Sequence, residues 1–303
     1  MTDKPVTTII LTFNSECSIG AVVESCRELS SRILVVDSFS TDNTRQTAEA
    51  MGCEVVTHPF DNYSIQRNWA QEYAALCPDE WVLHLDSDEV LSPELAQSIR
   101  EALSGDTADV DGFLMQRLSY FLGKPIRYGH LNPSWHLRLY RPGKGCCENR
   151  LYDQHFLVDG PTRRLSGMLL DLQITTLEKW TAAHNRWSSA EAVEVTTRLH
   201  EETDGDGRTL PASLRGDIRM KKRWLKNNVW YRSPLLVRPL VFFIYSYFFR
   251  LGFLDGKAGL IYHILQSFWF RFLVDAKIYE MKMPDSELNA PLLSVTSPQG
   301  ASR

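Results

Sequence analysis

The chain has 303 residues, of which 44% are hydrophobic and 23% are charged, a composition typical of a folded globular protein. That length can bury one large core or two modest ones. The formal net charge of -4 and the pI near 6.1 argue against the domain-wide basic surface of a nucleic-acid binder, so no nucleic-acid partner is expected.

The N-terminal sequence and the cysteines favour a cytoplasmic protein. Residues 1–16 contain only a short apolar run and no small-residue cleavage pattern, which indicates a first strand instead of a secretion signal. The six cysteines show no CxxC spacing, and none has a His neighbour at zinc-site distance. Reduced thiols are therefore expected.

Short β-branched runs alternate with helical patterns over the first third of the chain. The expected strands are 8–13, 33–37, 54–57 and 81–85. Such alternation is typical of βαβ units, in which a parallel sheet is covered by helices on both faces. The sequence therefore predicts an α/β fold for this part.

Capping signals predict where the intervening helices begin. A first helix is expected around 19–26, because apolar residues recur there at helical spacing. Ser40 or Thr41 is expected to cap the second helix, and the third should start near Tyr63. Ser92 followed by Pro93 predicts the start of a fourth.

Polar residues follow the predicted strands, at 14–16, 37–38, 58–61 and 86–88. Ligands of open α/β sheets bind at the carboxyl ends of the strands, so these segments are the candidate site. Neither GxGxxG nor GxxxxGK[ST] is present, which argues against a dinucleotide enzyme or a P-loop nucleotide hydrolase. Phosphate has to be held in another way.

Longer strand-like stretches follow Gly112 and predict a mixed region. In the segment 135–141, alternation should direct Trp135, Leu137 and Leu139 to one face of a strand. The residues between them, His136, Arg138 and Tyr140, are then expected on the other face.

From about Leu177 the pattern becomes helical, with a polar surface loop expected at 200–213. Between 215 and 238 there are eight Lys or Arg residues and one acid, and the apolar run 239–249 follows. That run is too short to span a bilayer, which takes ~20 residues, but it suits a helix lying at an anionic membrane surface. The alternative is a hydrophobic helical subdomain packed on the sheet. The tail from Pro284 is expected to be disordered.

Asp86 and Asp88 follow the apolar predicted strand 81–85, and this is the strongest local feature of the sequence. Two adjacent carboxylates repel each other unless a cation joins them, and Mg²⁺ or Mn²⁺ is commonly held by one or two carboxylates together with substrate phosphate oxygens. Such a metal would neutralise a leaving diphosphate. A solvated acidic loop explains the pair by itself equally well.

Four ordered strings resemble the family 2 glycosyltransferases of the GT-A fold. They are IILTFNSE, ILVVDSFSTDNT, SIQRNWA and WVLHLDSDEVLSPEL, all within the first 105 residues. The later strings GFLMQRLSYFLGKPIRYG, LRLYRPGKG and GFLDGKAGL are similar to the branch that contains lipopolysaccharide-core glycosyltransferases. The resemblance implies a GT-A, Rossmann-like, mainly parallel sheet flanked by helices, with a helical, membrane-surface C-terminal region.

The resemblance assigns roles on the donor side. It implies that Thr12, Asn14 and Glu16 lie beside the nucleotide and that Asp37 approaches its base or ribose. Ser38 departs from the family's frequent second Asp. Residues implied to line the donor are Gln66, Arg67 and Asn68, with Arg67 as a possible phosphate ligand; for it, an exposed helix-surface charge is the alternative. The resemblance makes Asp86 and Asp88 the metal-diphosphate motif. Arg138 and Arg141 face either the diphosphate or solvent.

An inverting transfer needs a base that takes the proton of the acceptor hydroxyl. The segment 148–156 offers Asp153, Glu148 and His155. Asp153 is the expected base, because Asp153-Gln154 stands where related sequences often have a His-Glu pair, and Glu148 is the second candidate. His155 is a candidate metal or phosphate ligand, or an ordinary buried histidine.

The expected organisation is a catalytic, nucleotide-sugar-binding domain at 1–175, a helical, basic-aromatic, membrane-associating region at 176–283 and a tail at 284–303. The expected function is a glycosyltransferase using Mg²⁺ or Mn²⁺, peripheral at the inner face of the membrane, that acts on a glycan or lipid-linked glycan in surface polysaccharide synthesis. Alternatives are a polyprenyl-phosphate sugar synthase, a nucleotidyltransferase, or a non-catalytic sugar-nucleotide-binding or scaffold protein. No pattern in the sequence predicts the sugar or the oligomeric state.

Overall fold

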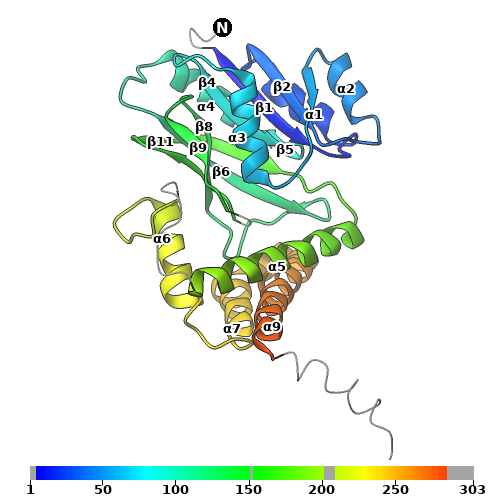
Figure 1. Cartoon of the computed structure of the whole chain (residues 1–303), viewed down its shortest axis with the longest axis vertical. Coiled ribbons are helices and arrows are strands. Elements are labelled where there is room, and N and C mark those ends of the chain that lie inside the picture. Colours follow the sequence, from blue (N-terminus) through cyan, green and yellow to red (C-terminus); the bar gives the residue numbers. More distant parts are fainter. Residues whose placement is uncertain (1–4, 151–152, 201–208, 285–303) are drawn as a thin grey trace, which may run out of the picture.

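The computed structural model of the chain describes residues 5–150, 153–200 and 209–284. An α/β part contains the N-terminal half, and a layer of helices lies beneath it (Figure 1). The tail expected from Pro284 falls outside the described residues apart from Pro284 itself, and so does most of the surface loop expected at 200–213.

Four parallel strands form the first half of the main sheet, in the order β3-β2-β1-β4. They are β1 (Val6–Thr12), β2 (Arg32–Asp37), β3 (Glu54–Thr57) and β4 (Trp81–Asp86). Every residue of β1 is buried, as a central strand covered on both faces should be. The strands expected from the sequence are therefore confirmed.

Helices cover both faces of this sheet. One core cluster joins the sheet to α1 (Ile19–Cys26), α2 (Thr44–Ala50) and α4 (Pro93–Ser104). The other joins it to α3 (Tyr63–Ala74), which contributes Ala70 and Ala74. The α/β class expected from the alternating pattern is confirmed.

Of the four expected helix starts, those near residue 19, Tyr63 and Ser92 are confirmed and the one at Ser40 or Thr41 is wrong. The Ser92 hydroxyl accepts from the Leu95 N–H at 3.2 Å as an N-cap, and α3 begins at Tyr63. Neither Ser40 nor Thr41 caps α2, which begins at Thr44. The Ser40 hydroxyl instead donates to Asp37, three residues earlier, at 2.5 Å within the turn after β2.

Most of the remaining strands extend the sheet beyond β4, whereas β9 and β10 pair with each other in a separate two-stranded sheet. The remaining strands are β5 (Glu89–Leu91), β6 (Gly112–Phe121), β7 (Lys124–Pro125), β8 (Ser134–Tyr140), β9 (Gly145–Cys147), β10 (Phe156–Val158) and β11 (Thr162–Asp171). The order continues β4-β8-β6-β11-β5, with β8 antiparallel to both neighbours and β11 parallel to β6. The strands β1, β2, β4, β6 and β11 therefore all end at one edge of the sheet.

A bulge in β8 overturns the simple alternation expected there. Phe113 of β6 is opposite Leu139, and the next residue, Leu114, is opposite Leu137, so Arg138 is the extra residue. Leu139 consequently packs in one core cluster, whereas Leu137 and Tyr140 pack in the other. A bulge reorients the side chains around it, and here it affects Arg138, whose position proves important below.

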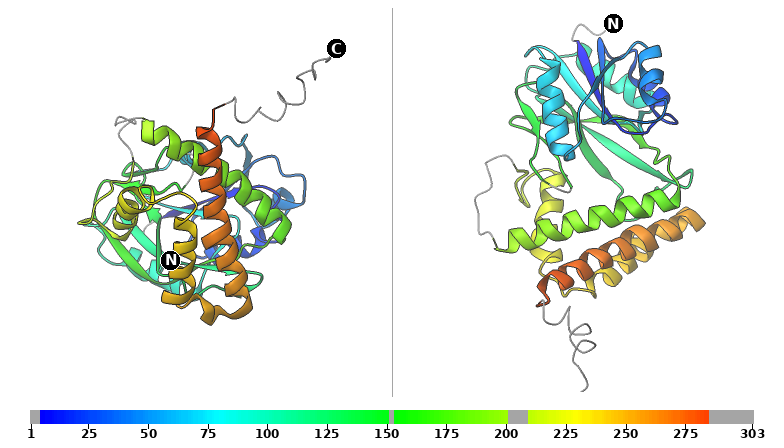
Figure 2. Two further views of the ribbon diagram at one scale, coloured as in Figure 1. Left: turned by 90° about the horizontal axis from the view of Figure 1, so that it is seen from below. Right: turned by 45° about the vertical axis from the view of Figure 1, so that its right-hand side comes forward.

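The chain turns helical at α5 (Leu177–His200), as expected. The later helical elements are α6 (Ile218–Leu225), η1 (Lys226–Trp230), α7 (Arg238–Ile244), η2 (Tyr245–Phe249), η3 (Gly252–Asp255), α8 (Gly256–Tyr262), η4 (His263–Trp269) and α9 (Phe270–Lys282). Helix α5 crosses between the sheet and the pair α7 and α9 (Figures 1 and 2). It packs on α9 through a core that includes Ala192, Phe270 and Val274. The division into domains expected at residue 175 remains a prediction.

The basic residues of 215–238 do not all face outward. Arg219, Arg223, Lys226 and Arg238 form ion pairs with acids of the fold. Arg238, for example, is 4% exposed and pairs with buried Asp275. The charges of these four residues therefore neutralise carboxylates within the protein, and membrane contact of the basic-aromatic region remains a prediction.

A broad apolar surface is nevertheless exposed on the helical layer. It is made by α7, η2, η3 and α8, and we call it the apolar face. Its members include Leu240, Val241, Ile244, Phe248, Phe249, Leu251, Phe253, Leu254 and Ile261. Among the helices in the described ranges, none has the length and apolar character needed to cross a membrane.

Candidate active site

Two arginines from different elements hold Asp86, the last residue of β4. Arg67 of α3 donates to its Oδ1 at 2.8 Å, and Arg138 of β8 donates to its Oδ2 at 2.7 Å. Burial raises the pKa of Asp86, but Arg138 and Arg67 outweigh burial and hold that pKa far below its ordinary value. Asp86 is therefore ionised. Arg67 is only 8% exposed, so the alternative of a surface charge is wrong.

The same cluster continues toward β5 and β6. The Arg138 guanidinium also donates to Glu89 at 2.6 Å, and Glu89 accepts the backbone N–H of Asp86. Arg117 of β6 lies 3.8 Å from Glu89 and 3.7 Å from Asp171. Arg138 is thus a buried partner of two acids and not a surface strand charge.

Asp88 differs from its neighbours because, in the part of the chain that the structure describes, no arginine or lysine forms an ion pair with it. Burial raises its pKa well above the ordinary value, and the carboxylates of Asp171, Asp86 and Glu89 raise it further against the effect of Arg117. A site with surplus negative charge and hard oxygen donors is one that a divalent cation fits. Asp88 is therefore better suited than Asp86 to bind such an ion.

His155 does not join the acidic pair. Its Nδ1 lies 3.0 Å from Glu148 and 2.8 Å from a guanidinium nitrogen of Arg223. Within the described residues, no three His, Cys, Asp or Glu side chains are grouped so that they could hold a metal ion. The expected set of Asp86, Asp88 and His155 is therefore wrong as a three-ligand site. A cation at Asp88 would take its other ligands from substrate and water.

Residues after β1 fasten the loop that follows β2. Asn14 accepts from the Thr41 N–H at 2.8 Å, and Glu16 accepts from the Asn43 N–H at 3.1 Å. Thr12 is buried, and its hydroxyl has no hydrogen-bond partner among the described residues. These three residues therefore lie at the expected edge, although Asn14 and Glu16 already have protein partners.

The carboxylate of Asp37 is fully buried. It accepts both the hydroxyl and the N–H of Ser40, at 2.5 and 2.8 Å. Ser38 accepts from Gln66 at 3.3 Å, and Gln66 is also 2.7 Å from His58. Asp37 thus organises the turn after β2, and its direct contact with a nucleotide stays a prediction.

Asn68 and Arg141 hold backbone segments. The Asn68 amide exchanges two hydrogen bonds with the backbone of Cys147, at 2.9 and 2.8 Å. Arg141 donates to the carbonyl oxygens of Val110 and Thr107. Neither side chain contacts the Asp86 cluster, so these two are positioned to support the fold.

Glu148 is fully buried and has both oxygens engaged. Arg223 donates to them at 3.0 and 2.7 Å, and the N–H groups of His155 and Leu210 donate as well. Burial raises the pKa of Glu148, but His155 and Arg223 outweigh it, so the pKa lies well below its ordinary value. A buried carboxylate with no free lone pair is poorly placed to accept a substrate proton.

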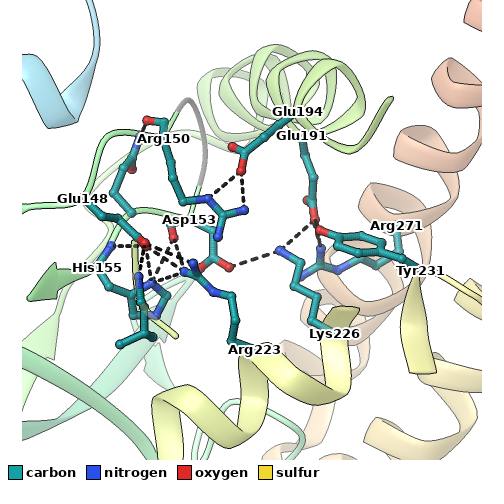
Figure 3. A network of polar contacts seen from close by, with 12 residues as sticks. Glu148, Arg150, Asp153, His155, Glu191, Glu194, Arg223, Lys226, Tyr231 and Arg271 are labelled. Atoms are coloured by element: carbon teal, nitrogen blue, oxygen red, sulfur yellow. Dashed lines mark hydrogen bonds and ion pairs between the residues drawn. The ribbon is translucent and has the colours of Figure 1, made fainter. Parts of the chain in front are cut away.

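Asp153 is more accessible, with a side chain that is 39% exposed. Its Oδ2 lies 3.1 Å from the Lys226 ammonium, which also lies 3.0 Å from Glu191 of α5. Arg271 of α9 pairs with the same Glu191, and this chain of contacts is visible in Figure 3. Burial raises the pKa of Asp153, but Lys226, His155 and Arg223 lower it to below its ordinary value.

Phe156 connects the two clusters. It follows His155 by one residue, and its ring centroid lies 5.2 Å from the guanidinium of Arg67 and 5.7 Å from that of Arg138. His136 is also close to both clusters, since Arg117, Arg138 and His155 all add to the effect of burial in lowering its pKa. The short segment 153–156 therefore contacts the helical layer through Asp153 and the arginines of the acidic cluster through Phe156.

Several site residues were not singled out from the sequence. Arg223, Lys226 and Glu89 complete the two charged clusters, and only their tertiary partners reveal them. Phe13 and Phe39, which follow β1 and β2, are 59% and 57% exposed. An aromatic residue just after a strand at the ligand edge was the available signal for these two.

The sheet order, the antiparallel β8 and the acidic cluster at the carboxyl edge define a GT-A type of α/β protein with a helical region at its C-terminal side. Residues 7–156 match the model of Glycosyl transferase family 2. Residues 7–156 therefore belong to this glycosyltransferase family, as the resemblance implied.

Similar proteins include an uncharacterized glycosyltransferase of Rickettsia typhi, 31% identical over 153 residues, which are 50% of this chain and 48% of that protein. One from Rickettsia prowazekii is 30% identical over 154 residues, again 50% and 48%. The chain spans about half the length of the curated relatives it matches. Among solved structures, glucosyl-3-phosphoglycerate synthase from Mycobacterium tuberculosis with Mn²⁺ and UDP-glucose is 22% identical over 40% of this chain and 45% of that chain, with a TM-score of 0.31.

Proposed function

We propose that this protein transfers a sugar from a nucleotide-sugar donor to a hydroxyl of a lipid-linked glycan, with inversion and with Mg²⁺ or Mn²⁺. The observation that best supports this function is Asp88, an acid without an ion-pair partner in the described chain. It lies at the carboxyl edge of the sheet, beside Asp86, which Arg67 and Arg138 hold in place. That edge is where α/β proteins bind their ligands.

On the donor side, the protein's task is to bind and orient the nucleotide diphosphate. Asp88 would hold the metal ion, which when bound neutralises the charge that develops on the leaving diphosphate. Asp86 cannot rotate away, because two guanidinium groups hold its two oxygens. The rings of Phe13 and Phe39 are exposed and would stack on the nucleobase.

On the acceptor side, Asp153 is the proposed base. As the acceptor oxygen attacks the anomeric carbon, its proton passes to a carboxylate oxygen of Asp153. The bond from that carbon to the diphosphate oxygen breaks on the opposite face, and the nucleoside diphosphate leaves with the electron pair. Lys226 would keep Asp153 ionised and oriented before the transfer.

The apolar face supports an acceptor that resides in a membrane. Phe249 is 75% exposed and Val241 is 59% exposed, and burial of such side chains in lipid is favourable. All six cysteines are free thiols, which fits a protein working at the cytoplasmic side of that membrane in surface polysaccharide synthesis.

The donor half is tested with Asp88→Asn and the matched surface change Asp109→Asn, whose carboxylate is 71% exposed. We expect Asp88→Asn to lose Mn²⁺-dependent thermal stabilisation by nucleoside diphosphates and sugar nucleotides and to lower turnover by at least about 100-fold, while Asp109→Asn behaves as wild type. Unchanged metal-dependent turnover in Asp88→Asn would refute the proposal.

The base is tested separately with Asp153→Asn. This variant should still bind the donor nucleotide but lose about 10² to 10⁴ in turnover, the usual contribution of a general base. If it turns over normally, Asp153 is not the base, and Glu148→Gln is the next variant to measure.

A further inference from the structure

A groove opens between the β6–β7 hairpin and the start of the last helices. It has a volume of about 720 Å³ and is lined on one side by Lys124 and Arg127 and on the other by Leu254, Lys257 and Ile261. A second hollow of about 270 Å³ adjoins it, shares Arg127 and reaches Phe249 and Arg250. Neither the donor site nor the proposed base uses these residues.

The groove has an excess of positive charge. Its acid, Asp255, is engaged in fastening the hairpin loop, because its two oxygens accept the backbone N–H groups of Arg127 and Tyr128 at 3.1 and 2.9 Å. For the side chains of Lys124, Arg127 and Lys257, no carboxylate partner is present within the described ranges. Three cations around one hollow favour a multiply charged anion.

The surroundings of the groove are apolar. Leu122 and Leu254 on its walls are each 52% exposed, and the groove adjoins the apolar face through Phe249 and Leu251. A soluble anion would bind the cations but would make no favourable contact with these apolar side chains. A molecule with a charged head and a hydrocarbon chain would use both features.

The groove is also placed to serve the proposed transfer. β6 ends at the same sheet edge as β4, and Arg117 of the acidic cluster lies on β6. From Arg117 to Phe121, where β6 ends, the strand advances about 13 Å at 3.3 Å per residue. A sugar joined to a diphosphate spans a gap of this size.

We propose that the groove of Lys124, Arg127 and Lys257 binds the phosphate or diphosphate headgroup of the lipid-linked acceptor. The hydrocarbon chain would lie along the apolar face, and the sugar would point toward Asp153. The lipid-acceptor part of this inference rests on the proposed function, but headgroup binding itself is measured without turnover.

The experiment measures sedimentation of the full chain with phosphatidylcholine vesicles that contain a polyprenyl diphosphate. Vesicles with phosphatidylglycerol at equal surface charge are the comparison. We expect wild type to prefer the polyprenyl diphosphate, and the pair Arg127→Glu with Lys257→Glu to bind at least about tenfold more weakly. The pair Lys144→Glu with Lys179→Glu makes the same charge change at exposed positions outside the groove and should bind as wild type.

Thermal stabilisation by nucleoside diphosphate with Mn²⁺ is recorded for all three proteins. Equal stabilisation of the three proteins shows that the groove variant is folded. If the nucleoside diphosphate does not stabilise wild type, the proposed function is wrong, and the vesicle measurement then tests headgroup binding independently. Vesicle binding of the groove pair equal to that of wild type overturns the headgroup site. Soluble inorganic pyrophosphate is added as a competitor. If it displaces the protein fully, with an affinity equal to that of the polyprenyl diphosphate, the groove binds a free phosphate and not a lipid headgroup.

Discussion

Arg138 shows how one residue can connect a fold to its site. The bulge in β8 leaves it opposite no residue of β6, and its guanidinium is 5% exposed while it contacts both Asp86 and Glu89. A buried cation between two acids compensates the unfavourable desolvation of all three groups. Removing it would leave Asp86 with Arg67 alone and Glu89 with the more distant Arg117 alone.

We therefore expect Arg138→Met to lower the free energy of unfolding by about 3 to 5 kcal/mol, because buried Glu89 loses its 2.6 Å partner and keeps only Arg117, at 3.8 Å. Denaturant titration measures this. Adding Glu89→Gln to Arg138→Met should restore part of the loss. A single variant as stable as wild type would show that the buried charges are compensated in another way.

Lys226 should control the pH range in which Asp153 can act. A base works only when ionised, and the pKa of Asp153 lies below its ordinary value, so wild-type turnover should not fall as the pH is lowered toward 5. Lys226→Met removes the positive charge that contributes most to lowering the pKa of Asp153, so that pKa rises. The acid limb of the turnover profile should then move to higher pH, and an unmoved limb would argue against Asp153 as the base.

At the scale of elements, α5 contributes both to the charged network and to stability. His184 is 6% exposed, stacks on Trp180 and is 2.9 Å from the carbonyl oxygen of that residue through Nδ1. Burial lowers the pKa of His184 from 6.5 to about 4. Between these values the unfolded chain binds the proton and the folded chain does not.

The stability that neutral His184 contributes is therefore lost as the pH falls from about 7 toward 4. We expect this group alone to reduce the free energy of unfolding by about 2 kcal/mol at pH 5 relative to pH 8. Urea titrations at the two pH values measure the difference, and His184→Gln should show a correspondingly smaller one. Equal pH dependence in the two proteins would mean that folding does not lower the pKa of His184.

At the scale of the whole molecule, the carboxyl edge of the sheet and the helical layer face each other, with α5 between the sheet and α7 and α9 (Figure 1). Lys226 and Arg223 reach from the helical layer to Asp153 and Glu148. The proposed acceptor side is thus made by both parts of the chain. The apolar face is exposed on the same helical layer.

Phe249 offers a direct test of that surface. Because Phe249 is 75% exposed, Phe249→Ser removes little packing in the folded state. The substitution should nevertheless weaken the free energy of binding to lipid vesicles, measured by sedimentation, by about 1.5 to 3 kcal/mol, the value of burying a Phe side chain. Tyr73→Ser on α3, where Tyr73 is 45% exposed, is the matched control. Equal vesicle binding of both variants and wild type would show that the apolar face does not contact a membrane.

Local signals predicted much of the parallel half. The buried strand before Asp86 and the Ser92-Pro93 helix start depend on neighbours within a few residues, and both are present in the structure. The predicted start of α2 was wrong because the hydroxyl of Ser40, a residue type that often caps helices, donates a hydrogen bond to the Asp37 carboxylate instead. The resemblance to family 2 glycosyltransferases was confirmed by the match of residues 7–156.

The sequence by itself determined the α/β class, the edge where polar residues gather and the acidic pair, since hydrophobic periodicity and strand ends are local properties. Only the tertiary structure decided which charges are free. Arg223 neutralises Glu148 across 75 positions and Arg138 neutralises Asp86 across 52. Ion pairs form between groups brought together by folding, whatever their separation along the chain, so Asp88 and the groove at Lys124 could be recognised as unbalanced only after every other charge had been placed.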